Sequence, residues 1–147
     1  MDIWDKRKRS EVMSKIRSKD TKPELVFRKA LFNKGFRYRM HVKDLPGKPD
    51  IVLPKYKTVI FVHGCFWHYH ENCSEGRIPD TNSKFWRDKL IKNVERDKKN
   101  QKGLEQKGWN VIVVWECEIE KKLKETLENV EKQLNIRQHT LYSNNTQ

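Results

Sequence analysis

The sequence predicts an α/β fold in which a mixed central sheet is flanked by helices. Three observations predict it. Short apolar segments at 50–54, 58–63 and 109–117 have the length and residue types of strands. Segments with apolar residues at helical spacing lie at 83–107 and 118–134. Strands that alternate with helices in this way are typical of a sheet with helices packed on it.

The N-terminal part of the chain is predicted to be a basic arm followed by helices. Residues 1–9 carry four adjacent cationic side chains, a cluster that favours contact with a polyanion such as DNA: Lys6, Arg7, Lys8 and Arg9. A short helix is expected over 10–17. The next helix begins at Thr21, an N-cap that forms a capping box with Glu24, and it ends at about Lys34. Four residues are expected to form its apolar side: Leu25, Phe27, Leu31 and Phe32.

The sheet is predicted to begin with a strand over 36–42 and to continue with a hairpin. Strands 50–54 and 58–63 are joined by a short turn, so they should pair antiparallel. We expect this pairing to bring Asp50 opposite His63, within one residue. Asp50 alone reads as a turn residue. If Asp50 lies beside an imidazole at the end of a sheet, we interpret it as a metal ligand next to an acid–base group.

The second half of the chain completes the domain. A polar, turn-rich segment precedes Ser83, which is expected to cap the helix through Lys107. A strongly apolar, buried strand and a last helix follow. We expect one domain over 10–136 and a disordered tail over 137–147.

Composition limits the partners. The chain has 147 residues and a formal net charge of +12, which favours one domain that binds nucleic acid. No apolar run approaches the ~20 residues of a membrane span, and we expect no membrane partner. The N-terminus lacks the apolar stretch of a signal peptide. These features predict a cytoplasmic protein.

The stretch TVIFVHGCFWHYHENC holds more metal-capable groups than one site needs. Cys65, His70 and Cys73 have a spacing that suits a tetrahedral zinc site, and Cys117 could supply the fourth ligand. Inert buried thiols are the alternative. The spacing does not choose between His70 and His68 as the ligand. One set of groups is therefore predicted to bind a structural metal, and the remainder to perform chemistry.

Four segments resemble the very short patch repair DNA mismatch endonucleases of bacteria: GKPDIVLP, VIFVHGCFWHYH, FWRDKLIKNVERD and GWNVIVVWEC. The resemblance runs in order from about Arg9 to Cys117. It implies a restriction-endonuclease-like fold with a structural zinc site. It also implies nicking of DNA 5′ to the T of a T:G mismatch, the product of 5-methylcytosine deamination, with Mg²⁺ as the catalytic metal.

The resemblance implies a role for each matching residue. Asp50 and the main-chain carbonyl of Val62 would bind Mg²⁺, and His63 and His68 would be the catalytic histidines. The structural Zn²⁺ would be held by Cys65, His70, Cys73 and Cys117. Three aromatic residues would insert into the duplex beside the mismatch: Phe66, Trp67 and Trp86. Two acidic residues would support the histidines: Glu24 and Asp97. The HYHENC loop departs in length from the family pattern.

Some of these residues have simpler interpretations. Glu24 could be only the partner of Thr21 in a capping box. Asp97 shares the apolar face of its helix with Leu90 and Val94, and an acid there needs a partner, for which a catalytic histidine is suitable. Aromatic residues are usually part of the core, and adjacent ones reach a common target only from an exposed loop.

Two other functions fit the sequence less well. A restriction-type endonuclease would cut both strands of unmismatched DNA, and a non-catalytic zinc module would only bind nucleic acid. We expect a monomer that binds double-stranded DNA containing a T:G mismatch and is associated with the bacterial nucleoid when bound. Functional links to a cytosine-5 DNA methyltransferase and to mismatch-repair proteins are also expected from the resemblance.

Overall fold

The computed structural model describes residues 21–145, so the predicted basic arm and the helix expected over 10–17 lie outside the described residues. Short 3₁₀ turns occur at Pro54–Tyr56 and Ser74–Gly76. The helices and strands are α2 (Lys22–Asn33), β1 (Ile51–Leu53), β2 (Thr58–His63), β3 (Asn110–Trp115), α3 (Ser83–Gln106) and α4 (Glu116–Asn145). None of the described helices is long and apolar enough to cross a bilayer.

The three strands form one small mixed sheet in the order β1-β2-β3, which confirms the predicted α/β class. β1 runs antiparallel to β2, with Leu53 opposite Thr58. β3 runs parallel to β2, with His63 opposite Trp115. The narrower assignment to a restriction-endonuclease-like fold stays a prediction.

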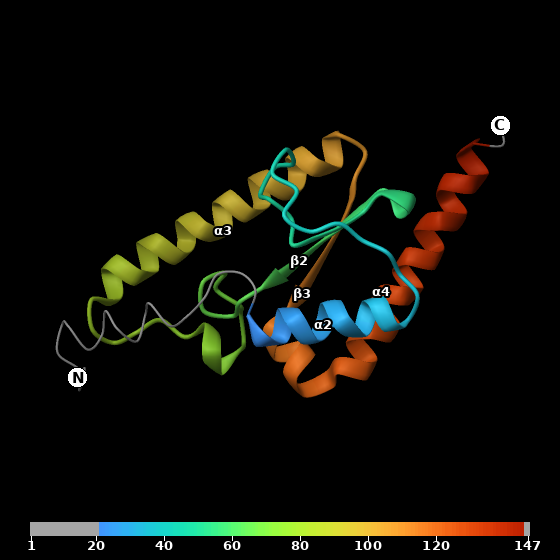
Figure 1. Ribbon diagram of the computed structural model, residues 1–147. Coiled ribbons are helices and arrows are strands. Elements are labelled where there is room, and N and C mark those ends of the chain that lie inside the picture. Colours follow the sequence, from blue (N-terminus) through green and yellow to red (C-terminus); the bar gives the residue numbers. More distant parts are fainter. Residues whose placement is uncertain (1–20, 146–147) are drawn as a thin grey trace.

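Helices cover both faces of the sheet (Figure 1). Successive residues of a strand point to opposite faces, and the two faces belong to different cores. Ile60 and Val62 pack in the cluster that includes residues of α2 and α4. Val59 and Phe61 pack with Leu104 of α3. Because both faces are covered, all six residues of β2 are buried, unlike the half-exposed strand of an open sheet.

Helix α2 begins and ends as the sequence predicts. The Thr21 hydroxyl accepts a hydrogen bond from the Glu24 N–H at 3.4 Å. After the helix, Gly35 adopts a φ of +99°, a left-handed conformation that glycine adopts without strain. The predicted apolar side is only half correct. Phe27 and Leu31 are fully buried, whereas the other two residues are each 48% exposed: Leu25 and Phe32.

Two predicted strands differ from the structure. The segment 36–42 is not a strand and makes a single antiparallel bridge, from Arg39 to Val52. His41 has a φ of 58°, which ends any extended run there. β3 is a strand as expected, but only Ile112 and Val114 of it are buried.

Both helices after residue 82 also differ at their ends. Asn82, not Ser83, is the N-cap of α3, and it has a left-handed φ of 56°. Helix α4 has one non-helical residue, Lys122, and continues to Asn145. The predicted disordered tail is therefore wrong as far as residue 145. The Arg137 guanidinium donates to the carbonyl of Gly108 at 2.8 Å, and this contact holds the last part of α4 against the domain.

Candidate active site and metal cluster

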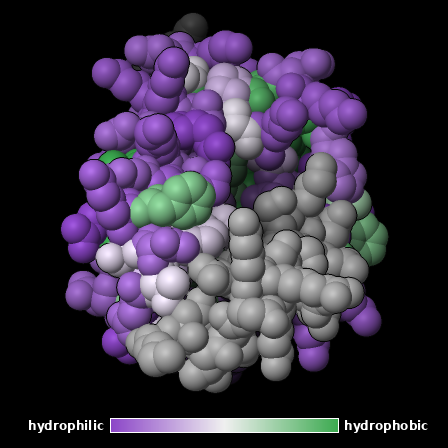
Figure 2. Space-filling view, turned by 90° about the vertical axis from the view of Figure 1, so that its left-hand side faces the viewer, coloured by the Kyte–Doolittle hydropathy of each residue, from purple (hydrophilic) through white to green (hydrophobic). Residues whose placement is uncertain are grey.

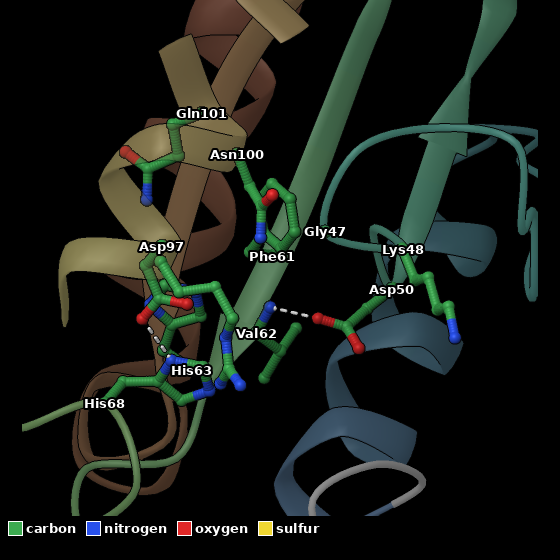
Figure 3. Close-up of a pocket in the computed structure, with 11 residues that line it drawn as sticks. Gly47, Lys48, Asp50, Phe61, Val62, His63, His68, Asp97, Asn100 and Gln101 are labelled. Atoms are coloured by element: carbon green, nitrogen blue, oxygen red, sulfur yellow. Dashed lines mark hydrogen bonds and ion pairs between the residues drawn. The ribbon is translucent and has the colours of Figure 1, made fainter. Parts of the chain in front are cut away.

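A pocket of about 460 Å³ lies at the end of β2, between β1 and α3 (Figure 3). It brings together five of the predicted site residues from three parts of the chain. Its lining residues are Gly47, Lys48, Asp50, Phe61, Val62, His63, His68, Arg96, Asp97, Asn100 and Gln101. The wall therefore combines carboxylates and imidazoles with cations that suit a phosphate.

Asp50 enters this pocket just before β1 begins. The prediction that it faces His63 is wrong, because the turn places Leu53 opposite Thr58 and so shifts the pairing by two residues. The Asp50 carboxylate instead accepts a hydrogen bond from the Val62 N–H at 2.7 Å. Burial raises the pKa of Asp50 to about 7, although the Val62 hydrogen bond acts in the opposite direction. A bound cation would stabilise the charged carboxylate.

The two histidines of the pocket form a stacked pair. The rings of His63 and His68 lie 3.8 Å apart and 3° from parallel. Asp97 holds the second ring, with its Oδ2 at 2.6 Å from Nδ1 of His68. The acid on the apolar face of α3 thus has the histidine partner that we expected. Burial, followed by the neighbouring His68, lowers the pKa of His63 to about 4, so this imidazole is neutral near pH 7.

Tight turns after β2 bring His68 back onto His63. The His68 N–H donates to the Gly64 carbonyl at 3.1 Å, and the chain reverses there. Asn93 of α3 fixes the same turn, since its amide donates to the Trp67 carbonyl at 3.0 Å. Sequence reasoning missed Asn93. The signal available was a polar side chain one position before Val94, on a helix that carries Asp97.

Glu24 is buried, with 3% of its surface exposed. Its carboxylate forms an ion pair with Arg28 at 3.2 Å. Glu24 also lines a second pocket, of about 230 Å³, which Asp50 shares with the first. Its negative charge contributes to the raised pKa of Asp50. Glu24 therefore belongs to the capping box with Thr21 and also lies near the pocket. That it supports a catalytic histidine stays a prediction.

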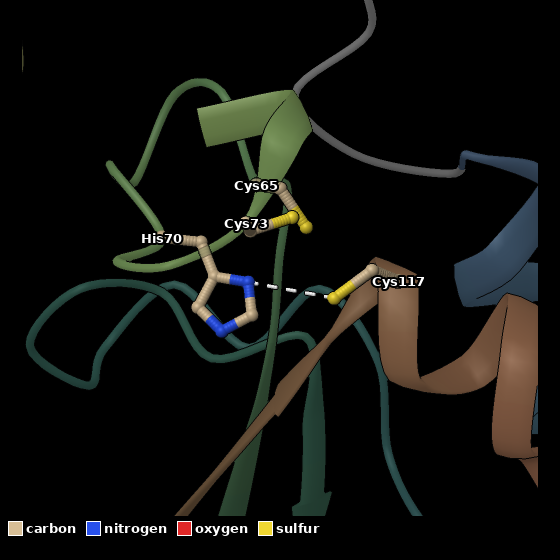
Figure 4. A group of neighbouring side chains, drawn as sticks. All are labelled: Cys65, His70, Cys73 and Cys117. Carbon is tan, nitrogen blue, oxygen red and sulfur yellow. Dashed lines mark hydrogen bonds between the residues drawn. The ribbon is translucent and has the colours of Figure 1, made fainter. Parts of the chain in front are cut away.

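The three cysteines and His70 meet in one cluster (Figure 4). Their ligand atoms all lie within 4.8 Å of one another. A tetrahedral zinc site with bonds of about 2.0–2.3 Å needs ligand atoms roughly 3.5–3.8 Å apart, so a small contraction would close the cluster on a metal. The group can therefore bind a metal ion, and the geometry favours His70 over His68 as the nitrogen ligand.

Local backbone features assemble this cluster. The His70 N–H donates to the Cys65 carbonyl at 2.9 Å, which folds the first two ligands together. Gly76 packs so closely against the His70 backbone that a Cβ would clash with it. Cys117 comes from the first turn of α4, and its Sγ lies 3.4 Å from Nδ1 of His70. Burial raises the pKa of the Cys65 and Cys117 thiols, which a metal would lower again.

The three predicted wedge residues lie together. The ring centroid of Phe66 lies 5.0 Å from the ring centroid of Trp67 and 5.5 Å from that of Trp86. The three side chains are half-buried, and the adjacent Phe85, which sequence reasoning missed, is 61% exposed. In the part of the chain that the structure describes, the indole N–H of Trp67 is the buried side-chain donor without a hydrogen-bond partner. Such a donor is unusual in a residue that serves only the core.

Two cations at the pocket were also missed. Lys48 lies two residues before Asp50, and Arg96 directly precedes Asp97 on α3. In both cases the available signal was a basic residue within two positions of a predicted catalytic acid. Arg96 also lines a further groove on α3 with Lys89 and Lys92. A row of cations therefore leads along the helix into the pocket.

Comparison with known proteins identifies the family. Residues 1–75 match the family DNA mismatch endonuclease Vsr. A relative in Neisseria meningitidis serogroup A, the type II nicking enzyme V.NmeAIP, is 59% identical over 82% of this chain and 86% of its own length. The DNA mismatch endonuclease Vsr of Escherichia coli strain K12 is 43% identical over 79% of this chain and 74% of its own length.

These comparisons place the chain among endonucleases, the enzymes that hydrolyse phosphodiester bonds within DNA. More narrowly, it belongs to the DNA mismatch endonuclease Vsr family. The family resemblance seen in the sequence is thereby confirmed.

Proposed function

We propose that this protein nicks one DNA strand 5′ to the T of a T:G mismatch and so starts the repair of deaminated 5-methylcytosine. The observation that carries the proposal is the group of Asp97, His68 and His63 opposite Asp50 in one pocket. A hydrolytic nick needs a base for water and a cation site for the phosphate, and the two sides of this pocket supply one each.

His68 is the general base in this proposal. With Asp97 at 2.6 Å, the proton of the neutral ring belongs on Nδ1, where it is donated to the carboxylate. The other nitrogen, Nε2, is then unprotonated and can take a proton from water. His63 stays neutral because its pKa is lowered to about 4, so it can accept a second hydrogen bond from the attacking water.

Asp50 and the Val62 carbonyl are the proposed Mg²⁺ ligands. A strand residue points its N–H and its C=O to the same neighbour, and the Val62 N–H already points to Asp50. The carbonyl of Val62 should therefore face the same edge. Hard oxygen ligands of this kind suit Mg²⁺, which would offset the charge on the reacting phosphate when bound.

The Cys65, His70, Cys73 and Cys117 group is proposed to bind Zn²⁺. Three thiolates and one imidazole at these separations match a closed structural site and leave no position for a water. The metal would hold the turn-rich segment after β2 to the first turn of α4. Its role is to stabilise the fold, and the hydrolytic chemistry belongs to the neighbouring pocket.

DNA is proposed to lie along the first half of α3. Lys89, Lys92 and Arg96 line a groove there beside the exposed Phe85. On the part of the face in Figure 2 that is coloured by hydropathy, hydrophilic residues cover most of the surface, with few hydrophobic side chains among them. Phosphates would bind the cations, while Phe66, Trp67 and Trp86 would open the base step next to the mismatch. A mismatched step costs less to open, which favours T:G over T:A.

A nicking assay tests the proposal. Duplexes that differ only in one T:G or T:A pair, with each strand labelled separately, are incubated with the protein and Mg²⁺. We expect one cut, 5′ to the mismatched T, and none with chelator or with T:A. Cleavage of both strands of the T:A duplex would indicate a restriction-type enzyme. Binding with no cleavage would indicate a non-catalytic module.

Partners and location follow from the same proposal. We infer that a monomer acts on chromosomal DNA in the bacterial cytoplasm. The T:G substrate would arise where a cytosine-5 DNA methyltransferase works, and mismatch-repair proteins would compete for or assist at the same mismatch.

A further inference from the structure

Trp115 lies between the metal cluster and the catalytic pocket. It is the last residue of β3 and the register partner of His63 at the end of β2. Parallel neighbours in register point their side chains to the same face of the sheet, so the indole and the imidazole share the face that α3 covers. Cys117, two residues later, belongs to the metal cluster.

The Trp115 ring contacts one histidine from each site. It stacks on His70, with centroids 4.0 Å apart and an interplanar angle of 8°. It meets His63 edge to face at 5.2 Å and 75°. His63 in turn stacks on His68. A continuous line of rings therefore runs from the metal cluster to the histidine that Asp97 holds.

Among the described residues, ring packing fixes the orientation of His63. Within residues 21–145, no hydrogen bond holds its ring, in contrast to His68 with its carboxylate partner. Three rings surround it: His68, Trp115 and Phe61, the last at 5.7 Å. Phe61 and His68 each contact the ring as well, but only Trp115 comes from a neighbouring strand and is itself held by a metal-cluster residue.

We propose that Trp115 is a positioning residue for the nicking reaction. Its indole fixes the His63 ring against His68, and its stacking on His70 makes this arrangement depend on the closed metal cluster. The inference rests on the proposed function, in which His63 and His68 act on the attacking water. Trp115 itself touches neither the DNA nor the metal in this proposal.

The variant Trp115→Leu removes the ring and keeps an apolar side chain. We expect kcat for T:G nicking to fall by about 10- to 100-fold, because a misplaced catalytic group loses that much. KM and mismatch affinity should change little, since the substitution touches no DNA-binding residue. Trp115→Phe keeps an aromatic ring at the same place and should recover most of the lost kcat.

Trp109→Leu is the matched control. Trp109 precedes β3 by one residue, lies an even number of positions from Trp115 and so shares its face, at the far end from the site. It is half-buried, and the Lys57 ammonium lies 4.2 Å from its ring centroid. Both substitutions should lower the thermal stability, but only the one at Trp115 should lower kcat.

A second measurement needs no activity. In the zinc-loaded, DNA-free protein, the NMR cross-relaxation signals (NOEs) between the ring protons of His63 and His68, which stack at 3.8 Å, should weaken in Trp115→Leu and stay as in wild type in Trp109→Leu. Unchanged histidine signals, an unchanged kcat, or an equal loss of kcat in Trp109→Leu would each overturn the proposal. Should the wild-type protein fail to nick any duplex, the proposed function fails, whereas the NMR signals still decide whether Trp115 positions His63.

Discussion

Replacing Asp50 by asparagine is expected to abolish nicking and, in the absence of Mg²⁺, to stabilise the fold above neutral pH. The reason is that burial raises the pKa of the Asp50 carboxyl from 3.8 to about 7. The folded state therefore favours the protonated acid. This contribution to stability is complete below about pH 4 and is lost as the pH rises through about 7. Asparagine never carries this charge.

The size of the effect follows from the pKa. At about 1.4 kcal/mol for each pH unit, a rise from 3.8 to about 7 corresponds to a cost of at most about 4 kcal/mol at pH 8. His63 adds a second pH dependence of opposite direction, since its lowered pKa gives stability that is present above about 6.5 and lost as the pH falls through about 4. Both proteins contain His63, so this contribution cancels in their difference.

Urea denaturation at pH 5 and pH 8 measures the difference, in buffers without Mg²⁺ but with zinc retained. Asp50→Asn should gain stability relative to wild type at pH 8 and lose most of that gain at pH 5. Asp44→Asn, which alters an exposed carboxylate, is the control and should behave as wild type at both values. Adding Mg²⁺ at pH 8 should stabilise the wild type and not Asp50→Asn. A difference that does not depend on pH would refute the reasoning.

Three sets of substitutions test the metal cluster, the aromatic group and the basic groove separately. Cys117→Ser should lower the bound zinc and the melting temperature together, because a structural site contributes folding energy; normal stability without zinc contradicts this. Trp67→Ala and Trp86→Ala should each weaken T:G binding by roughly 10- to 100-fold, with T:A binding kept at low salt. An equal loss of stability and of all binding would instead identify them as core. Lys89→Ala with Lys92→Ala should reduce the slope of log affinity against log salt by about 2 without changing T:G preference, which an unchanged slope would contradict.

The sequence predicts those parts of the structure that local patterns determine. β2 and the start of α2 were placed correctly, because an apolar run and the Thr21 cap act within a few residues. The three cysteines could be chosen because thiols and an imidazole at such spacing have few other uses, whereas the choice of His70 over His68 came from the family resemblance. Asp97 could be chosen because an acid on an apolar face needs a partner.

Features that depend on distant contacts could not be predicted in this way. The end of α4 looks polar in sequence, yet Arg137 holds it to the Tyr56 and Gly108 carbonyls. The left-handed φ of His41 interrupts a segment whose alternating residues favour a strand. Asn93 and Trp115 contact the turns after β2, which are distant from both residues in the sequence. Their contacts exist only after α3 and β3 have packed on the end of β2.

The segment from His63 to Cys73 carries the proposed ligands for one site and the proposed catalytic groups for the other, and the structure gives a physical reason for combining them. The segment is made of turns, and turns without regular hydrogen bonding open readily. Two structures hold it: α3 through Asn93 and Asp97, and the end of β3 with the start of α4 through Trp115 and the cluster. Closing the cluster on a metal fixes one end of the segment, and so removes freedom that the His63–His68 pair would otherwise have to lose when DNA binds.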